Sequence, residues 1–489
     1  MSADAIRFLR RGEVITYRVS NPMQTVLDYL RLEERSRGTK EGCNEGDCGA
    51  CTVALGRLVD GRVVYEPANA CILLMGHLHG RELVTVDDLA QGDRLHPVQQ
   101  AMVDEHGSQC GFCTPGFVMS LWTLHHAGRK PDRQAIVDQL AGNLCRCTGY
   151  RPIIAAAEKS CTGEASDAWA TLSREIGVQL AMLDDETDIL CGRPDSFVAL
   201  PAKADTLLDL YSRNPDATIV AGATDVGLWI TKQLRSLPKV IHTGRVKALH
   251  AVSERTATIS IGAAVTYAEA EKLLGSISVD IAEVLRRIGS KQVRTSGTVG
   301  GNIANGSPIG DMPPILIALG ARINLRKLAD QRIIELEDYF LDYGKQDRLA
   351  GELLWRIDIP KLNSNERFFA HKISKRFDQD ISSVMAAFKF IMAGRTIGGA
   401  RLAFGGMAAT PRRARETEAA LIGLKIDAPE TWDQAIATLA KDFTPLSDMR
   451  ASSHYRMETA QALLRKALEE LVYGHEVRLV GPPRKEAWA

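Results

Sequence analysis

Eight of the ten cysteines in this chain lie between Cys43 and Cys147, and none follows Cys191. A disulfide scaffold belongs to a short secreted chain with cysteines along its whole length, whereas this chain has 489 residues. The crowding therefore argues against a disulfide framework and indicates that the N-terminal part binds metal through thiolates. Its fold must bring soft ligands together in small volumes.

The first four of these cysteines have the order C-x4-C-x2-C followed by a distant fourth. They are Cys43, Cys48, Cys51 and Cys71, called here the first thiol set. This is the spacing of plant-type 2Fe–2S ligation, in which two irons need four converging thiolates. Glycines between them let the backbone curl around a cluster and point N–H groups at sulfur, which raises the reduction potential.

The other four cysteines form a C-x2-C pair followed by a C-x-C pair. They are Cys110, Cys113, Cys145 and Cys147, called here the second thiol set. A helix over 114–124 and a second one from Asp132 to about residue 142 are expected to run antiparallel, which brings the two pairs together. The C-x-C pair is awkward for tetrahedral zinc, but it suits two ligands on one iron of a small cluster.

Structural zinc is the main alternative for these eight thiols, and it would make the chain a zinc-stapled binding protein without a redox role. Cys161 and Cys191 have no partners at ligand spacing, so we expect both to be ordinary buried residues.

Sixty basic and sixty acidic residues cancel, so the surface offers no bulk attraction for nucleic acid or for an anionic membrane. The N-terminus has no basic region leading into a long apolar run, and the best apolar stretch, 314–319, is far too short to span a bilayer. The sequence therefore predicts a cytoplasmic protein, where thiols stay reduced.

The secondary structure that the sequence favours changes several times along the chain. Residues 1–80 favour short strands at 13–19, 52–55 and 62–65, with one helix over 23–31 capped by Asn21 and Pro22. Residues 85–160 favour helices, and 161–192 reads as a polar linker with some helix. Strands at 217–221, 239–242 and 257–261 and a helix over 267–274 follow, and the final part has a strand over 384–392 and a helix over 459–472.

Two stretches rich in small residues, 219–227 and 295–303, stand out in the cysteine-free part. Glycines permit backbone conformations that point successive N–H groups inward, which suits a pyrophosphate. Neither stretch is the G-x-G-x-x-G of a Rossmann unit, so a nicotinamide site of that type is not predicted. Taken alone, each stretch is a weak signal for a pyrophosphate site and favours a plain tight turn.

The cysteine loops resemble those of the xanthine dehydrogenase family of molybdenum hydroxylases. The resemblance rests on 42–53 for the first set, and on 109–116 and 143–150 for the second. It implies a multidomain α+β fold. The parts are a β-grasp 2Fe–2S ferredoxin domain (1–84), a helical-bundle 2Fe–2S domain (85–160), a linker (161–192), a vanillyl-alcohol-oxidase-type FAD domain (193–370) and an α+β C-terminal flavoprotein domain (371–489).

Both glycine-rich stretches also resemble the FAD-binding segments of that family. The resemblance implies FAD-binding roles for Ile219, Val220, Ala221, Gly222, Ala223, Thr224, Asp225, Val226, Thr298, Gly300, Gly301, Asn302, Ile303, Asp311, Leu354 and Lys372. The chain departs from relatives at 342–345 and at Ile288, positions that bear on the NAD and adenine contacts.

The resemblance further implies a small subunit of a two-subunit xanthine dehydrogenase. Electrons from purine hydroxylation at a partner's molybdenum cofactor would pass through the second thiol set's cluster, the first set's cluster and FAD to NAD⁺. It implies a heterotetramer of two small and two large subunits, and no residue here is nominated as a catalytic acid or base. The alternative is the same role in an aldehyde, nicotinate or carbon monoxide dehydrogenase.

Overall fold

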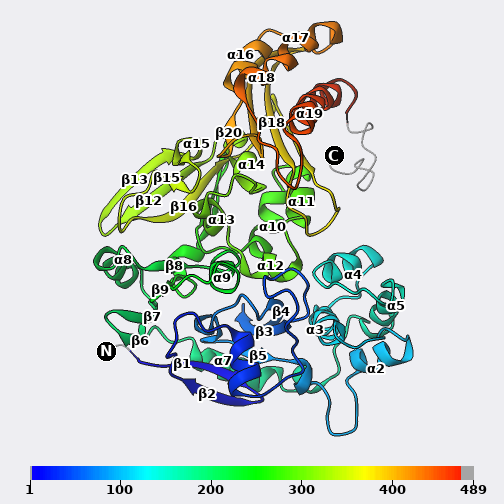
Figure 1. Cartoon of the computed structure of the whole chain (residues 1–489), viewed down its shortest axis with the longest axis vertical. Coiled ribbons are helices and arrows are strands. Elements are labelled where there is room, and N and C mark those ends of the chain that lie inside the picture. The colour runs from blue at the N-terminus through cyan, green and yellow to red at the C-terminus, as the bar shows by residue number, and fades with distance from the viewer. Residues whose placement is uncertain (1–2, 475–489) are drawn as a thin grey trace. The chain divides into compact units, whose positions relative to one another are not determined.

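A computed structural model of the chain describes residues 3–474, so the end of the predicted C-terminal domain, 475–489, lies outside the described residues. Two compact units divide the chain (Figure 1). Unit 1 comprises Met1–Lys247 and Gly289–Gly297, and unit 2 comprises Ala248–Ile288 and Thr298–Ala489. The predicted FAD domain, 193–370, therefore contributes residues to both units.

Unit 1 begins with a five-stranded mixed sheet of the order β2-β1-β5-β3-β4. Its strands are β1 (Ile6–Arg10), β2 (Glu13–Tyr17), β3 (Thr52–Val59), β4 (Arg62–Asn69) and β5 (Glu82–Val84). The pair β1 and β5 is parallel and the other pairs are antiparallel. Asp60 and Gly61, both with positive φ, form the tight turn between β3 and β4. The three strands predicted in this region are confirmed.

The predicted helix over 23–31 is shorter and starts later than expected. It comprises α1 (Val26–Asp28) and a π-helical turn (Tyr29–Glu33). The predicted cap at Asn21 and Pro22 is wrong: Thr25 is the N-cap, and its hydroxyl accepts a hydrogen bond from the Asp28 N–H at 3.1 Å. The Asn21 side chain instead accepts from the Met23 N–H and closes a local turn.

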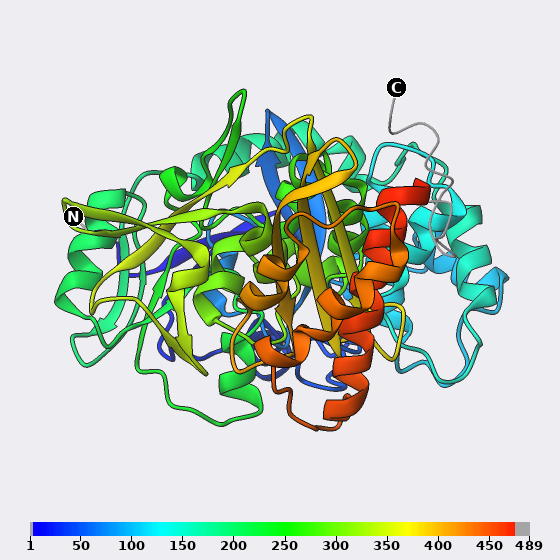
Figure 2. The ribbon, with the colours of Figure 1, turned by 90° about the horizontal axis from the view of Figure 1, so that it is seen from above.

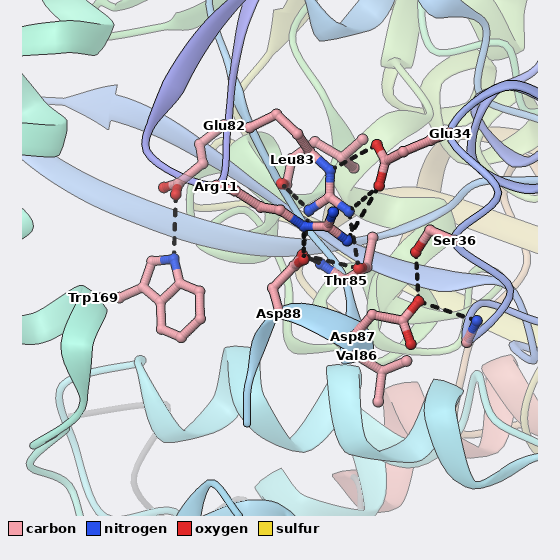
Figure 3. Close-up of polar contacts among 12 residues, drawn as sticks. Arg11, Glu34, Ser36, Glu82, Leu83, Thr85, Val86, Asp87, Asp88 and Trp169 are labelled. Atoms are coloured by element: carbon pink, nitrogen blue, oxygen red, sulfur yellow. Dashed lines mark hydrogen bonds and ion pairs between the residues drawn. The ribbon is translucent and has the colours of Figure 1, made fainter. Parts of the chain in front are cut away.

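A buried ion cluster fixes the end of β1. The guanidinium of Arg10, 4% exposed, pairs with Glu34 at 2.6 Å and with Asp88. Figure 3 shows the neighbouring Arg11 reaching the same two carboxylates, with Arg11 Nε 2.7 Å from Asp88. Because both carboxylates are largely buried, removing Arg10 would leave them without their main partner.

Helices accompany this sheet in unit 1. They are α2 (Pro97–Asp104), α3 (Thr114–His125), α4 (Arg133–Leu140), α5 (Arg151–Ser160), α6 (Ala168–Thr171) and α7 (Ser173–Leu183). The predicted helices at 114 and 132 are confirmed, and Asp132 caps α4. Helix α3 lies beside β3 and β4 (Figure 1). Its Phe117 and Trp122 are fully buried in the core. Helices α6 and α7 occupy the predicted linker, where α7 packs Ile176, Leu180 and Leu183 against Leu9.

The rest of unit 1 is a four-stranded sheet of the order β6-β7-β9-β8 with short helices. The elements are β6 (Ile189–Arg193), β7 (Ser196–Leu200), α8 (Ala204–Arg213), β8 (Thr218–Val220), α9 (Val226–Thr231), β9 (Lys239–His242) and α12 (Lys291–Ser296). Strands β7, β9 and β8 are parallel. Cys191 is buried in the core that this sheet shares with β1, as expected for a non-ligand thiol.

Unit 2 contains a five-stranded sheet, β10-β11-β16-β12-β13, and a four-stranded sheet, β17-β18-β19-β20, beside a β14-β15 hairpin. The strands are β10 (Val252–Glu254), β11 (Thr258–Gly262), β12 (Arg322–Lys327), β13 (Asp330–Glu335), β14 (Phe340–Asp342), β15 (Lys345–Gln346), β16 (Leu353–Pro360), β17 (Glu366–Ile373), β18 (Val384–Ala393), β19 (Thr396–Gly405) and β20 (Arg412–Arg413). The strands predicted at 257–261 and 384–392 are confirmed.

The helices of unit 2 cover these sheets. They are α10 (Tyr267–Gly275), α11 (Val279–Arg286), α13 (Val299–Asn305), α14 (Met312–Leu319), α15 (Leu336–Tyr339), α16 (Arg415–Leu421), α17 (Trp432–Ala437), α18 (Leu439–Asp442) and α19 (Ser453–Tyr473). Helix α14 is buried on all sides because it contacts strands of both larger sheets. Figure 2 shows α19 in red along the four-stranded sheet. Among the described residues, no helix has the length and apolar character needed to cross a bilayer.

Candidate cluster and flavin sites

The strand pair β3 and β4 brings the first thiol set together. Thr52 pairs with Asn69 at the end of this antiparallel ladder, so the residue before β3, Cys51, lies beside Cys71, which follows β4. Cys43 and Cys48 come from the preceding loop. The sulfur of Cys43 accepts hydrogen bonds from the N–H groups of Asp47 and Cys48, at 3.4 and 3.3 Å. The predicted turning of loop N–H groups toward sulfur is therefore present.

The thiols of the first set are linked to one another by hydrogen bonds. Hydrogen bonds from Cys48 and Cys71 hold the pKa of Cys43 well below its usual range. Hydrogen bonds to Cys43 and Cys51, together with burial, raise the pKa of Cys71 far above its own. Four sulfurs this close cannot all ionise unless a cation compensates their charge, and a coordinating metal deprotonates thiols in this way. The donor set fits a thiolate-held metal cluster.

The second thiol set lies at the start of α3 and just beyond the end of α4. Cys113 interacts with Cys145, and burial followed by this contact raises the pKa of Cys113 to about 12. Cys110 interacts with Cys147, and both of these residues are exposed. The Cys145 sulfur accepts from the Thr148 N–H at 3.5 Å. The predicted convergence of the two pairs is therefore observed.

The loops of the two thiol sets touch each other within unit 1. The N–H of Leu144 donates to the carbonyl oxygen of Cys48 at 3.0 Å, so the chain positions next to Cys145 and at Cys48 are joined directly. Glycines allow this approach: a Cβ at Gly116 would lie 2.1 Å from the Gly49 oxygen, and one at Gly49 would lie 2.1 Å from the Gly142 oxygen.

The first predicted flavin segment, 219–226, also lies in unit 1. Ile219 and Val220 end β8, residues 221–225 form a loop, and Val226 begins α9. A Cβ on Gly222 would lie 1.8 Å from the Ser296 oxygen, so this loop packs directly on the end of α12. A Cβ on Gly227 would lie 2.5 Å from the Cβ of Ile72, the residue after Cys71. The segment is therefore in close contact with the first thiol set's surroundings.

Two histidines near this segment, the half-buried His77 and the buried His242, carry no sequence signal and were not predicted. The His77 ring lies 2.7 Å from the Ala221 oxygen through Nε2, and burial lowers the pKa of His77 to about 4. The His242 ring is 4.7 Å from that of His77. His77 therefore connects the region after Cys71 to the carbonyl of a predicted flavin residue.

The second predicted segment belongs to unit 2. Thr298 caps α13, and its hydroxyl accepts from the Gly301 N–H at 2.9 Å. Gly300 packs against Ala263, where an added Cβ would lie 2.5 Å from the Ala263 Cβ. Ile303 is fully buried, and the Asn302 Oδ1 is buried without a hydrogen-bond partner in the described part of the chain. That oxygen is an acceptor that a ligand could satisfy.

The remaining predicted flavin residues also lie in unit 2. Lys372 on β17 pairs with Asp311 at 2.5 Å, and both side chains are largely buried. Ser382, which was not predicted, donates to the other oxygen of Asp311. Leu354 lies on β16 opposite Leu325 and belongs to the buried core of unit 2. The structure thus joins Asp311 and Lys372 and places Leu354 in apolar packing.

A separate group of ligand-type side chains lies beside the helical region. His96, His125 and Asp167 offer atoms within 4.8 Å of one another. However, His96 Nδ1 accepts from the Val98 N–H at 3.1 Å, so its Nε2 carries the proton and donates to Asp167 at 2.8 Å. His126 Nε2 lies 2.7 Å from the same carboxylate oxygen. These contacts describe a hydrogen-bonded clamp rather than a metal site.

This clamp predicts a pH-dependent contribution to stability. Burial raises the pKa of Asp167, but hydrogen bonds from His126 and His96 outweigh it and hold the pKa well below its usual range. The stabilisation is therefore fully present above about pH 4 and is lost as the pH falls through the folded-state pKa. We expect Asp167→Asn to lower the free energy of unfolding by about 2–4 kcal/mol at pH 7.

Urea unfolding followed by tryptophan fluorescence measures this effect, because Trp122 and Trp169 pack beside the clamp, with ring centroids 5.2 Å apart. Figure 3 shows Trp169 donating to Glu82. The control is Asp209→Asn, at an exposed position on α8. A difference between wild type and Asp167→Asn that stays constant down to pH 3 would contradict the role given to Asp167.

Comparison with known families matches four parts of the chain. Residues 9–75 match the 2Fe-2S iron-sulfur cluster binding domain and 85–158 the 2Fe-2S binding domain. Residues 194–362 match the FAD binding domain in molybdopterin dehydrogenase, and 369–471 match the CO dehydrogenase flavoprotein C-terminal domain. This chain belongs to the molybdenum hydroxylase family. It carries that family's two 2Fe–2S domains and its FAD-binding domain, which favours iron–sulfur clusters over structural zinc.

Curated relatives in the molybdenum hydroxylase family include xanthine dehydrogenases. The chain is 31% identical to the xanthine dehydrogenase/oxidase of Rattus norvegicus over 459 residues, which cover 83% of this chain and 34% of the relative. It is also 31% identical to the xanthine dehydrogenase of Drosophila pseudoobscura pseudoobscura, covering 86% and 36%. The chain thus spans about a third of the length of these relatives.

Solved structures of other molybdenum hydroxylases share the fold of part of the chain. A Cu,Mo-CO dehydrogenase is 28% identical with a TM-score of 0.52, covering 56% of this chain and 96% of that one. Quinoline 2-oxidoreductase from Pseudomonas putida 86 is 25% identical with a TM-score of 0.51, covering 55% and 94%. The family therefore includes members with different substrates.

Proposed function

We propose that this chain is the electron-transfer subunit of a xanthine dehydrogenase. It would receive electrons from a large subunit that holds the molybdenum cofactor and oxidises hypoxanthine and xanthine to urate, and it would deliver them to NAD⁺. Iron–sulfur clusters supply one-electron steps, and a flavin converts these into hydride transfer. The xanthine dehydrogenases at 31% identity support this choice of substrate.

The observation that carries the proposal is the unbroken chain of contacts within unit 1. Leu144, beside Cys145, donates to Cys48 of the first thiol set. Ile72, beside Cys71, lies against Gly227, one residue after the predicted flavin segment ends. Two cluster sites and part of a flavin site therefore follow one another in direct contact, as a route for electrons requires.

We assign the eight cysteines of the two thiol sets as the cluster ligands. We assign Ile219–Val226 and Thr298–Ile303 to the pyrophosphate and ribityl region of FAD. In unit 1, Gly222 keeps the first loop free of side-chain bulk. In unit 2, Asn302 Oδ1 offers an acceptor without a partner among the described residues. Asp311 and Lys372 would act as a pair, because each is the other's charged partner. Leu354 would support the site through packing.

The partner would dock at the second thiol set. Cys110 and Cys147 are exposed, and the apolar side chains of Phe112, Leu144 and Tyr150 are 49, 38 and 37% exposed around them. Exposed apolar groups of this kind mark protein interfaces. We propose a heterotetramer of two small and two large subunits, located in the cytoplasm because its ten unpaired cysteines suit a reducing compartment.

Purification of the native complex tests this function. We expect iron, flavin and molybdenum to co-purify with a large subunit, and the complex to reduce NAD⁺ with xanthine. The chain without its partner should reduce an artificial dye with NADH but should not oxidise xanthine. The similarity to CO dehydrogenase makes carbon monoxide the alternative substrate. NAD⁺ reduction with carbon monoxide and none with xanthine would contradict the purine assignment.

A further inference from the structure

We propose that Asn143 and Gln292 are positioning residues that lock the two cluster loops together, so that the Leu144–Cys48 hydrogen bond is an electron route between the clusters. The proposal rests on the proposed function, in which both thiol sets hold clusters. With clusters bound, the route would carry one electron and no proton, so that the second set's cluster would lose the electron that the first set's cluster gains.

The backbone contact itself supplies a short through-bond connection. Leu144 precedes the ligand Cys145, and its N–H donates at 3.0 Å to the carbonyl of the ligand Cys48. Each end of this hydrogen bond is therefore separated from a cluster ligand sulfur only by the covalent bonds of one or two residues. A small separation of the loops would break the connection, so its geometry needs support from neighbouring groups.

Asn143 supplies the first support. Its Nδ2 donates to the carbonyl of Gly49 at 3.1 Å and lies 3.3 Å from the hydroxyl of Thr52. Its Oδ1 accepts from Ser120 Oγ at 2.6 Å. Asn143 is only 2% exposed and lies two residues before Cys145, whereas Gly49 and Thr52 flank the first-set ligands Cys48 and Cys51. One amide therefore binds both loops at the hydrogen bond between them.

Gln292 supplies the second support from a distant part of the sequence. Its Nε2 lies 3.2 Å from Thr52 Oγ1, 3.2 Å from Ser120 Oγ and 3.1 Å from Asn143 Oδ1. It is 1% exposed, and a Cβ on Gly142 would lie 2.0 Å from its Oε1. The Gln292 side chain thus lies where the two cluster regions contact each other, and the absence of a side chain at Gly142 leaves room for it.

Gln292 also belongs to α12, whose C-terminal end packs on the flavin segment at Gly222. Thr295 of the same helix donates to the carbonyl of Pro67 on β4 at 2.7 Å. Helix α12 therefore contacts the second cluster region, the first cluster region and the first flavin loop. This placement within unit 1 explains why a buried glutamine, rather than an apolar residue, occupies position 292: it pairs polar groups from two regions at once.

The test compares Gln292→Leu and the nearly isosteric Gln292→Glu with Gln139→Leu and Gln139→Glu in the full chain with its partner. Gln139 is the matched control because it is also buried and donates to the Ser120 carbonyl and to Thr123, entirely within the helical region. We expect the Gln292 variants to exchange the Leu144 amide hydrogen about tenfold to hundredfold faster. We also expect a smaller magnetic splitting between the reduced clusters in electron paramagnetic resonance spectra.

Iron and flavin contents should stay at wild-type values in all four variants, and the Gln139 variants should keep the wild-type exchange rate and splitting. Unchanged exchange and unchanged splitting in both Gln292 variants would overturn the assignment while leaving the proposed function intact. The exchange measurement reports on the loop contact whether or not clusters are bound. A wild-type protein without two cluster signals would instead contradict the proposed function.

Discussion

Cys71→Ser is expected to remove one cluster, lowering the iron content from about four to about two per chain while the second cluster's spectrum persists. Cys71 is 1% exposed and interacts with both Cys43 and Cys51, so no solvent ligand can reach the vacated position easily. A serine hydroxyl is a hard ligand that stays protonated near neutral pH, whereas iron–sulfur clusters need soft thiolates. Iron analysis and electron paramagnetic resonance measure the loss.

The control for this prediction is Cys191→Ser. Cys191 is equally buried and belongs to the same core, and its thiol donates to the Asp4 carbonyl at 3.2 Å. A serine there keeps a donor, so both clusters should remain. Two intact clusters in Cys71→Ser, or the loss of one in Cys191→Ser, would contradict the division of the cysteines into ligands and core residues.

The cysteines could be predicted from the sequence because the chemistry requires a particular residue type at a particular spacing. Cys71 is distant in sequence from the other three, but two antiparallel strands bring it back beside Cys51, as the pairing of Thr52 with Asn69 shows. Asn143 lies inside a recognisable motif, yet nothing in its immediate sequence reveals that it binds Gly49. Gln292 is still less predictable, because its partners Thr52 and Ser120 are brought to it only by tertiary packing.

The same contrast applies to the helices and the flavin segments. Helix α3 was predictable from Thr114 and Pro115 at its start, and α19 was predictable from its apolar face. The helix start at Thr25 was not, because a local turn closed by Asn21 competes with the expected cap. The glycine-rich stretches at 219–227 and 295–303 could be located in the sequence, but their role could not be explained from it. Only the packing of Gly222 against Ser296 shows why a side chain is excluded there.

Gly222→Ala is therefore expected to lower flavin affinity by about tenfold to hundredfold, because overpacking typically costs about 1–3 kcal/mol. The added Cβ would lie 1.8 Å from the Ser296 oxygen and 2.9 Å from the Gly297 nitrogen. Both are backbone atoms, so the clash cannot be relieved by turning a side chain. Residues 296–297 immediately precede Thr298, the first residue of the second flavin segment.

Flavin and iron contents per chain, measured on the same purified protein, separate a local effect from misfolding. Iron should remain at the wild-type value, because the thiol sets contain neither Gly222 nor Ser296, while flavin and NADH-dependent dye reduction should fall together. Gly244→Ala is the control: a Cβ there meets no atom within 4 Å, so it should keep its flavin. Full flavin occupancy in Gly222→Ala, at flavin concentrations that half-saturate the wild type, would show that the loop at 221–225 does not hold the cofactor.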